Sequence, residues 1–331
     1  MRRRPTSRWR RFAFGALAAA LGMGVRAAPL RAQGGIAQEG ALELVLPVGA
    51  RAVALGQAVV ADFLGSESLW WNPAALAREQ TREGAIHHSQ TFALTGDALT
   101  VVIPAVPVGV VALSADLYSA GTQDVTDATG TYGTITPRTT IFAATFAGSL
   151  GSHAMVGLNY KFYQRGINCS GGCSGLPTQG TSTTALDMGV QFRPLRDSSL
   201  YVGVALRNVG PRLQVNDAPQ ADRLPTRLDI GVTYVPHLAS MGPDAELRLG
   251  ADVVSAISSS SPGVRVGADL GWQHRVHVRA GYASLAPGGS GPTIGVGAST
   301  GRLQLDIARL FSDNVANTGQ PPTYLSLRIV F

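Results

Sequence analysis

The feature that most constrains this chain is an alternation of apolar with charged or small residues, which recurs from about residue 83 to Phe331. Two segments illustrate it, RLDIGVTY (227–234) and ELRLGADV (246–253). Successive side chains of a strand point to opposite faces, so each such segment has one apolar face and one charged or small face. Repeated this often, the alternation predicts a single closed β-barrel with lipid outside and polar groups inside.

Alternation bounded by turn residues marks about fourteen candidate strands. Most have roughly the 9–11 residues that a tilted strand needs to cross a bilayer. The alternation is weakest in the first, second, fourth and twelfth. The candidates lie near 83–93, 97–104, 108–119, 138–148, 152–164, 182–194, 199–208, 225–236, 244–255, 263–273, 275–284, 291–299, 301–311 and 322–331.

The lengths of the connections between these strands also alternate. Short periplasmic turns and long outer loops are the layout of an outer-membrane barrel. A soluble β-sandwich also alternates along each strand, but it does not require loop length to follow strand parity. The long connections, which we expect to be extracellular loops, are 120–137, 165–181, 209–224, 256–262, 285–290 and 312–321.

The charged residues of the strands gather on one face. A Lys or Arg facing lipid at mid-membrane costs about 2–4 kcal/mol, so this face is expected to line the lumen, where opposite charges on neighbouring strands can pair. Arg309 is the exception, and we expect it either to snorkel to the lipid headgroups or to sit at a bulge. The lumen set is Asp116, Asp187, Arg193, Arg207, Arg227, Asp229, Glu246, Arg248, Arg265, Asp269, Arg279, Asp306 and Arg328.

Residues 1–32 have the layout of a secretory signal peptide, with cleavage near Ala28 or Ala32. A basic segment comes first, and an apolar run (12–25) follows that is shorter than the roughly 20 residues of a membrane anchor. The segment carries eight Arg and no acid, which leaves 19 basic against 21 acidic residues in the rest of the chain. The high pI of the whole chain therefore does not indicate a nucleic-acid-binding surface.

Residues 33–82 alternate poorly and are rich in Ala, Val and Gly. Their position before the first strand predicts a hatch that folds into the barrel formed by 83–331. The Asn72-Pro73 turn, followed by a short helical stretch, is either the functional corner of this hatch or only a loop that starts a helix.

Two segments of the hatch, VGARAVALGQAVVAD (48–62) and WWNPAALA (70–77), resemble the N-terminal signature of the PorV/PorQ family, which is related to the FadL-type outer-membrane transporters. Weaker similarities follow at 206–211, 223–234, 277–282 and 303–311. The matching hatch positions include Gly49, Arg51, Gly56, Trp71, Asn72 and Pro73.

This resemblance implies a fourteen-stranded barrel with a lumenal hatch, in the outer membrane of a diderm bacterium. Because the loops are modest, the PorV/PorQ reading is favoured: a type IX-like secretion component that binds or anchors cargo. The alternative is a FadL-like passive transporter of small hydrophobic molecules. It predicts a lateral gap in the wall and an apolar pocket near Val53, Leu55, Phe63 and Leu69.

Three further features concern stability and assembly. Cys169 and Cys173, in an exported Gly/Ser-rich loop, suit a loop-closing disulfide, with a free thiol pair as the alternative. The terminal Phe331 resembles the C-terminal signal that the barrel assembly machinery recognises. Aromatic residues expected to anchor the barrel at the lipid interfaces are Tyr160, Phe162, Tyr201, Tyr234, Trp272 and Tyr282.

Catalytic and metal-binding motifs are not found in the sequence. Asp124 and Asp127 fall short of a Ca²⁺ shell, and we expect them to be solvated loop acids. We therefore expect no enzyme activity and no cofactor. The expected partners are outer-membrane lipid, the barrel assembly machinery, and either secreted cargo and secretion-system components or a small hydrophobic ligand, with no nucleic acid.

Overall fold

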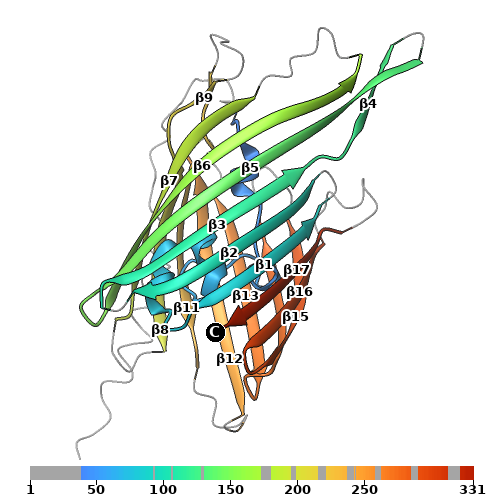
Figure 1. Cartoon of the computed structure of the whole chain (residues 1–331). Helices are drawn as coiled ribbons and strands as arrows, with labels where there is room; N and C mark the ends of the chain where they lie inside the picture. The colour runs from blue at the N-terminus through green and yellow to red at the C-terminus, as the bar shows by residue number, and fades with distance from the viewer. Residues whose placement is uncertain are drawn as a thin grey trace, which may run out of the picture. The chain divides into compact units, whose positions relative to one another are not determined.

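The computed structural model (Figure 1) describes most of the chain from residue 39 onward. The expected signal peptide and Cys173 lie outside the described residues. The described ranges are 39–91, 94–105, 107–127, 130–172, 180–194, 199–214, 221–236, 242, 244–257, 262–284, 290–311 and 321–331.

Fourteen antiparallel strands form a closed ring. The sheet contains fifteen strands in all, and β4 (Gln123–Asp127) is attached outside the ring. Pairing of β3 with β5 and of β1 with β17 closes the barrel. The ring strands are β1 (Glu83–Gln90), β2 (Thr95–Ala105), β3 (Gly109–Ser119), β5 (Gly130–Leu150), β6 (Ala154–Gly171), β7 (Thr181–Phe192), β8 (Leu200–Val209), β11 (Arg227–Tyr234), β12 (Ala245–Ala256), β13 (Gly263–Trp272), β14 (Val276–Ala283), β15 (Gly291–Thr300), β16 (Leu303–Leu310) and β17 (Thr323–Val330).

Each of the fourteen sequence segments overlaps one ring strand, including the four weak segments, so the predicted fold class is confirmed, although β5 and β6 extend well beyond the segments expected for them. At the seam, Glu83 of β1 lies opposite Val330 of β17, and the Phe331 N–H donates to the Arg82 carbonyl at 2.9 Å. A closed ring has no free sheet edge within the membrane, where an unpaired backbone group cannot be solvated.

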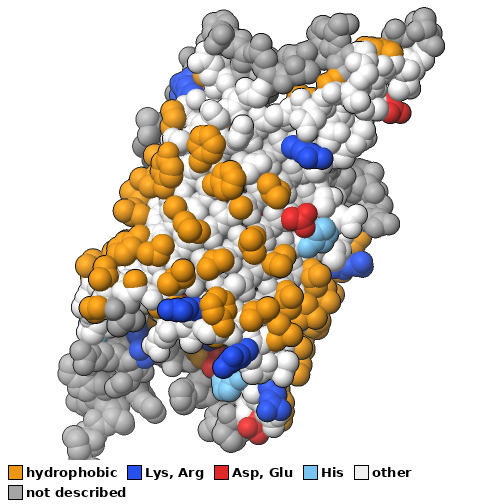
Figure 2. Space-filling model, in the orientation of Figure 1, with side chains coloured by type: hydrophobic (Ala, Val, Ile, Leu, Met, Phe, Trp, Pro, Cys, Tyr) orange, Lys and Arg blue, Asp and Glu red, His pale blue; other side chains and the backbone are white. Residues whose placement is uncertain are grey.

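The two faces of the wall differ as the alternation requires. Apolar side chains such as Leu113, Phe142 and Val296 are exposed on the outside, and they cover much of the face shown in Figure 2. Most of the charged residues assigned to the lumen are buried. Arg309 is exposed within a regular ladder, without a bulge, so its side chain lies on the outer face.

Three of the expected extracellular loops are in part strands. The segment 120–137 contains β4 and the first residues of β5, and β6 continues to Gly171. These residues are polar or exposed on both faces because the sheet extends beyond the lipid, so their sequence lacks the alternation that marks the ring. Cys169 lies in this extension and is disulfide-bonded. The segment 209–224 also contains a short hairpin, β9 (Leu213–Gln214) and β10 (Ala221–Asp222).

The hatch occupies the lumen as a series of short helical turns. They are η1 (Leu42–Val45), α2 (Ala50–Ala54), η2 (Gly65–Glu67), α3 (Ser68–Trp71) and η3 (Pro73–Arg78). Nearly every residue from 48 to 76 is buried. Within the described ranges, no helix is long and apolar enough to cross a bilayer.

The hatch backbone passes directly against glycines of the wall. A Cβ built on any of these glycines would clash with hatch atoms: at Gly203 with the Val60 carbonyl, and at Gly267 with the Leu55 carbonyl. The wall therefore leaves out side chains where the hatch backbone crosses it. We call these residues the glycine belt: Gly157, Gly189, Gly203, Gly250, Gly267, Gly281 and Gly295.

We predict that Gly203→Ala destabilises the barrel with its hatch in place by about 1–3 kcal/mol, the usual cost of overpacking. The matched control is Gly148→Ala, because a Cβ there would meet only the Val108 carbonyl at 3.7 Å. Urea unfolding in lipid vesicles measures both. Equal stability of the two variants would contradict the close approach of hatch and wall.

Candidate functional site

The first contact of the hatch with the wall is at α2. The Ala50 N–H donates to Ser326 Oγ of β17 at 2.8 Å. The Glu67 carboxylate accepts from the Ala52 N–H at 3.0 Å and from the Arg51 N–H at 3.4 Å, so it satisfies free donors of the first turn. Gly49, at φ 96°, has no room for a Cβ because Glu67 packs against it. Burial raises the pKa of Glu67 to about 7.

The second contact is the turn at Gly56. Its φ is 61°, and a Cβ would clash with backbone atoms of Val266 and Tyr282 on β13 and β14. Its N–H donates to Thr293 Oγ1 at 3.0 Å. This position therefore requires glycine for its conformation and for its close approach to the wall.

Trp71 joins two parts of the hatch and contacts the charged wall. Its Nε1–H donates to the Val48 carbonyl at 3.0 Å. The guanidinium groups of Arg207 and Arg265 lie 5.3 Å and 5.8 Å from the centroid of its ring, within the range of cation–π attraction. The motif tryptophan thus packs where the hatch meets β8 and β13.

Asn72 connects two segments of the hatch to each other and to the wall. Its Oδ1 accepts from the Ala74 N–H at 3.1 Å and caps η3, while Nδ2 donates to the Val60 carbonyl at 2.7 Å and to the Val190 carbonyl of β7 at 3.3 Å. Pro73 follows at the start of η3 and packs against Gly157. The Asn72-Pro73 turn therefore fixes one hatch segment to another and both to the wall.

Ion pairs line the lumen, as the sequence predicts. Buried pairs join neighbouring strands, with 2.7 Å between Lys161 Nζ and Asp187 Oδ2 and 2.7 Å between Arg207 Nη2 and Asp229 Oδ2. The sequence does not predict ion pairs between the wall and the hatch, because the hatch lacks the alternation that would show which way its acidic side chains point. Asp62 of the hatch accepts from Arg248 of β12 at 2.7 Å.

The lumen wall has an apolar side as well as a charged side. The inward positions of β2, β3 and β5 carry mostly Ala, Val, Ile, Thr and Ser, together with Tyr118, and Asp116 is the one buried charge among their described residues. Their apolar side chains share a core cluster with Val48, Leu64 and Leu69 of the hatch. We call these wall residues the apolar seam: Ala98, Val102, Val110, Ala112, Ile141, Ala143 and Ala147.

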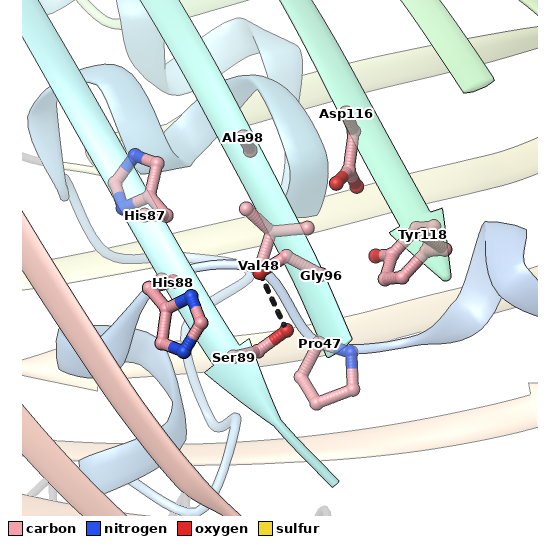
Figure 3. A pocket seen from close by; sticks show the side chains of 10 residues that line it. Pro47, Val48, His87, His88, Ser89, Gly96, Ala98, Asp116 and Tyr118 are labelled. Carbon is pink, nitrogen blue, oxygen red and sulfur yellow. Dashed lines mark hydrogen bonds between the residues drawn. The ribbon is translucent and has the colours of Figure 1, made fainter. Parts of the chain in front are cut away.

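Cavities at the middle of the lumen are small. One of about 10 Å³, hardly more than one water, lies between Val48 of the hatch and wall residues that include His87, Asp116 and Tyr118 (Figure 3). Beside it, Ser89 Oγ donates to the Gly96 carbonyl at 3.3 Å. His87 Nδ1 lies 2.8 Å from Ser326 Oγ. Within the described ranges, no group of three metal-ligating side chains occurs.

Larger cavities lie at the two mouths of the barrel, with volumes of about 140 Å³ and 230 Å³. Neither is lined by the residues around which the transporter hypothesis places an apolar pocket. Val53, Leu55 and Leu69 are instead buried in packed contacts. The ladders β17–β1–β2–β3 pair without a register shift, so this part of the wall shows no lateral gap among its described residues.

Tyr201 is the one expected interface aromatic that faces inward. The other five residues of that set are exposed on the outer face. The Tyr201 ring lies against the guanidinium groups of Arg78, 4.4 Å away, and Arg193, 5.6 Å away. Tyr201 lies an even number of residues from Gly203 and Arg207, so it points to the same face of β8 as they do. This spacing is the sequence signal that places Tyr201 in the lumen.

Comparison with known proteins gives similarity of fold. Neither a protein-family model nor a curated protein sequence matches the chain. Among solved structures, the toluene transporter TbuX of Ralstonia pickettii is 12% identical with a TM-score of 0.54, and the toluene transporter TodX of P. putida is 10% identical with a TM-score of 0.55. A FadL homologue of Pseudomonas aeruginosa is 11% identical with a TM-score of 0.50. Each alignment covers 86% of this chain and 98% of the other.

These similarities support the FadL-like part of the resemblance and give no support to a PorV/PorQ identity. Together with the outward apolar face, the fold places the chain in the outer membrane of a diderm bacterium.

We predict that Asn72→Ala loosens the hatch and lowers the free energy of unfolding by roughly 2–3 kcal/mol, since it removes a helix cap and leaves buried carbonyls unpaired. Hydrogen exchange of residues 57–76 and urea unfolding measure the effect. The control is Gln80→Ala, an exposed residue beyond η3. If the amides of residues 57–76 exchange no faster in Asn72→Ala than in this control, the Asn72-Pro73 turn does not hold the hatch segments together.

Proposed function

We propose that this protein is a FadL-like passive channel that admits small hydrophobic molecules across the outer membrane, with the hatch as its gate. The observation that carries the proposal is the apolar seam. On β2 and β3 the hatch meets Ala and Val side chains. Hydrogen bonds or ion pairs join the hatch to β5, β7, β12, β15 and β17, alongside an apolar cluster with β16 and β17.

An apolar molecule can pass along the seam without separating charges. Among the described residues, no hydrogen bond joins the hatch to β2 or β3, while bonds from Ser326, Thr293, Gln191 and Asn159 hold the hatch to other strands. A small displacement of the hatch away from β2 and β3 therefore breaks only apolar contacts. Two proteins of similar fold, TbuX and TodX, are toluene transporters, which agrees with a ligand of this class.

We predict that a polar side chain in the seam slows passage. In cells that lack other hydrocarbon channels, the wild-type protein is expected to raise the initial rate of radiolabelled toluene uptake, and Ala112→Asn to reduce that increase about 5- to 100-fold. This range corresponds to roughly 1–3 kcal/mol for an amide placed in an apolar path.

The matched control is Ala205→Asn, because Ala205 is equally buried and faces the lumen on the charged side. Barrel folding of each variant is checked by its heat-dependent electrophoretic mobility. Toluene uptake that the wild-type protein does not increase would refute the channel, and equal loss in the two variants would refute the seam as its route.

A secretion-associated role of PorV/PorQ type is a second candidate, favoured by the extracellular extension of the sheet. There β4 pairs with β5, and among the described residues no strand pairs with its other side. An open strand edge can accept a strand of another protein. Cargo that carries a C-terminal signal domain of the type IX kind would be the partner.

We predict for this candidate that cargo co-purifies with the full-length protein from its native outer membrane and not with a variant in which residues 121–136 are replaced by a two-residue Asn-Gly turn. Because Ser119 lies opposite Arg138, this change removes β4 and the part of β5 that pairs with it, and leaves the rest of β5 paired with β3. Equal recovery of cargo with both proteins would exclude β4 as the binding edge. No cargo with either protein would exclude the secretion role.

A further inference from the structure

The periplasmic mouth carries a row of inward-facing residues on three adjacent strands. Ala154 lies opposite Phe192, which lies opposite Val202, so His153, Arg193 and Tyr201 follow one another across the ends of β6, β7 and β8. The Arg193 N–H donates to the His153 carbonyl at 2.7 Å.

A cavity of about 140 Å³ lies between this row and the end of the hatch. The other residues that line it are Arg78, Ser149, Gly151, Ser152, Ala154 and Met155.

The lining is basic. It contains the guanidinium groups of Arg78 and Arg193 and the imidazole of His153, and no carboxylate is among its residues. Asp62 is the acid whose charge acts on Arg78, and it is engaged by Arg248 at 2.7 Å. A cavity of this composition selects for an anion.

Arg78 faces the cavity with an incompletely satisfied charge. Its guanidinium stacks 5.0 Å from the ring centroid of Phe63 and 4.4 Å from that of Tyr201. Its Nη1 is buried without a hydrogen-bond partner among the described residues. Burial lowers the pKa of Arg78. A buried N–H of a charged guanidinium that lacks a hydrogen-bond partner costs free energy, and a bound anion that accepts from this N–H offsets the cost.

Size and shape narrow the class of anion. An engineered cavity of about 150 Å³ holds benzene, so the volume here suits a single ring. Tyr201 and Met155 supply an aromatic and an apolar surface, and the planar fork of an arginine matches a carboxylate bidentately. We propose that the periplasmic mouth binds a monocyclic aromatic carboxylate, with its carboxylate on Arg78 and Arg193 and its ring beside Tyr201.

This site is separate from the apolar seam, and binding to it does not depend on conduction. Titration of the purified full-length protein with benzoate tests it by calorimetry. We expect saturable binding, weakened at least 10-fold by Arg78→Gln and less by Arg78→Lys, which keeps the charge and loses the fork. Arg212→Gln, at the extracellular mouth, is the matched control and should bind as the wild type does.

Two further probes decide the class of ligand. Benzyl alcohol has the same ring without the charge and should bind at least 10-fold more weakly than benzoate. Inorganic phosphate should not displace benzoate at equal concentration. Undiminished binding to folded Arg78→Gln, equal binding of benzyl alcohol, or displacement by phosphate would each overturn the proposal. Toluene uptake measured on the same variants reports separately on the channel.

Discussion

The close approach of the hatch backbone to the glycine belt is the constraint on which the rest of the lumen depends. A backbone that lies this near to a wall excludes water, so its N–H and C=O groups need partners within the protein. The wall supplies them from positions beside the belt: Thr293 binds Gly56, and Gln191 binds the carbonyls of Val60 and Asp62. Belt glycines and polar wall residues therefore together accommodate the hatch: most of the glycines leave room for its backbone, Gly189 and Gly295 leave room for Asn72 and Ala54, and the polar residues bind its N–H and C=O groups.

The buried charges of the lumen follow from the same arrangement. Lys161 and Asp187 are almost fully removed from solvent, and such a pair contributes little net stability after desolvation, whereas the loss of either partner leaves a costly lone charge. Their main effect is to fix position. Arg248 ties Asp62 to β12, and Arg207 donates to the Trp70 carbonyl, so the charged side of the wall orients the hatch directionally. Among the described residues, β2 and β3 make no comparable directional contact with the hatch, whereas Thr139 of β5 donates to Glu43 at 3.1 Å.

The sequence predicts the barrel well and the lumen incompletely, for a physical reason. Lipid on one side and a polar lumen on the other force a period of two, which is why even the strand with only Ile294 and Val296 against glycines is correctly placed. Where both faces contact water this constraint ends, and the sequence predicts a loop in place of β4. Parity also explains Tyr201: aromatic character predicts the lipid interface, but the residue shares its parity with the inward-facing Gly203 and Arg207. The belt glycines fit the alternation as small residues, but the backbone that approaches each of them is a property of tertiary structure.

Hydrogen bonds and ion pairs hold the hatch to some strands of the wall, whereas its contacts with β2 and β3 are apolar. In the proposed channel, this difference determines where the lumen opens. A piston-like movement of the whole hatch would break the contacts at Ser326, Thr293, Gln191 and Arg248 together, and each hydrogen bond to a buried group costs about 1–3 kcal/mol when left unmade. We expect a tilt of the hatch away from β2 and β3 to leave these contacts in place, because among the described residues no hydrogen bond joins the hatch to those strands. Their inward side chains include the apolar Val102 and Ala112. In the channel that we propose, an apolar molecule that enters this interface replaces the contacts that the tilt removes, so the ligand itself lowers the free energy of the open state.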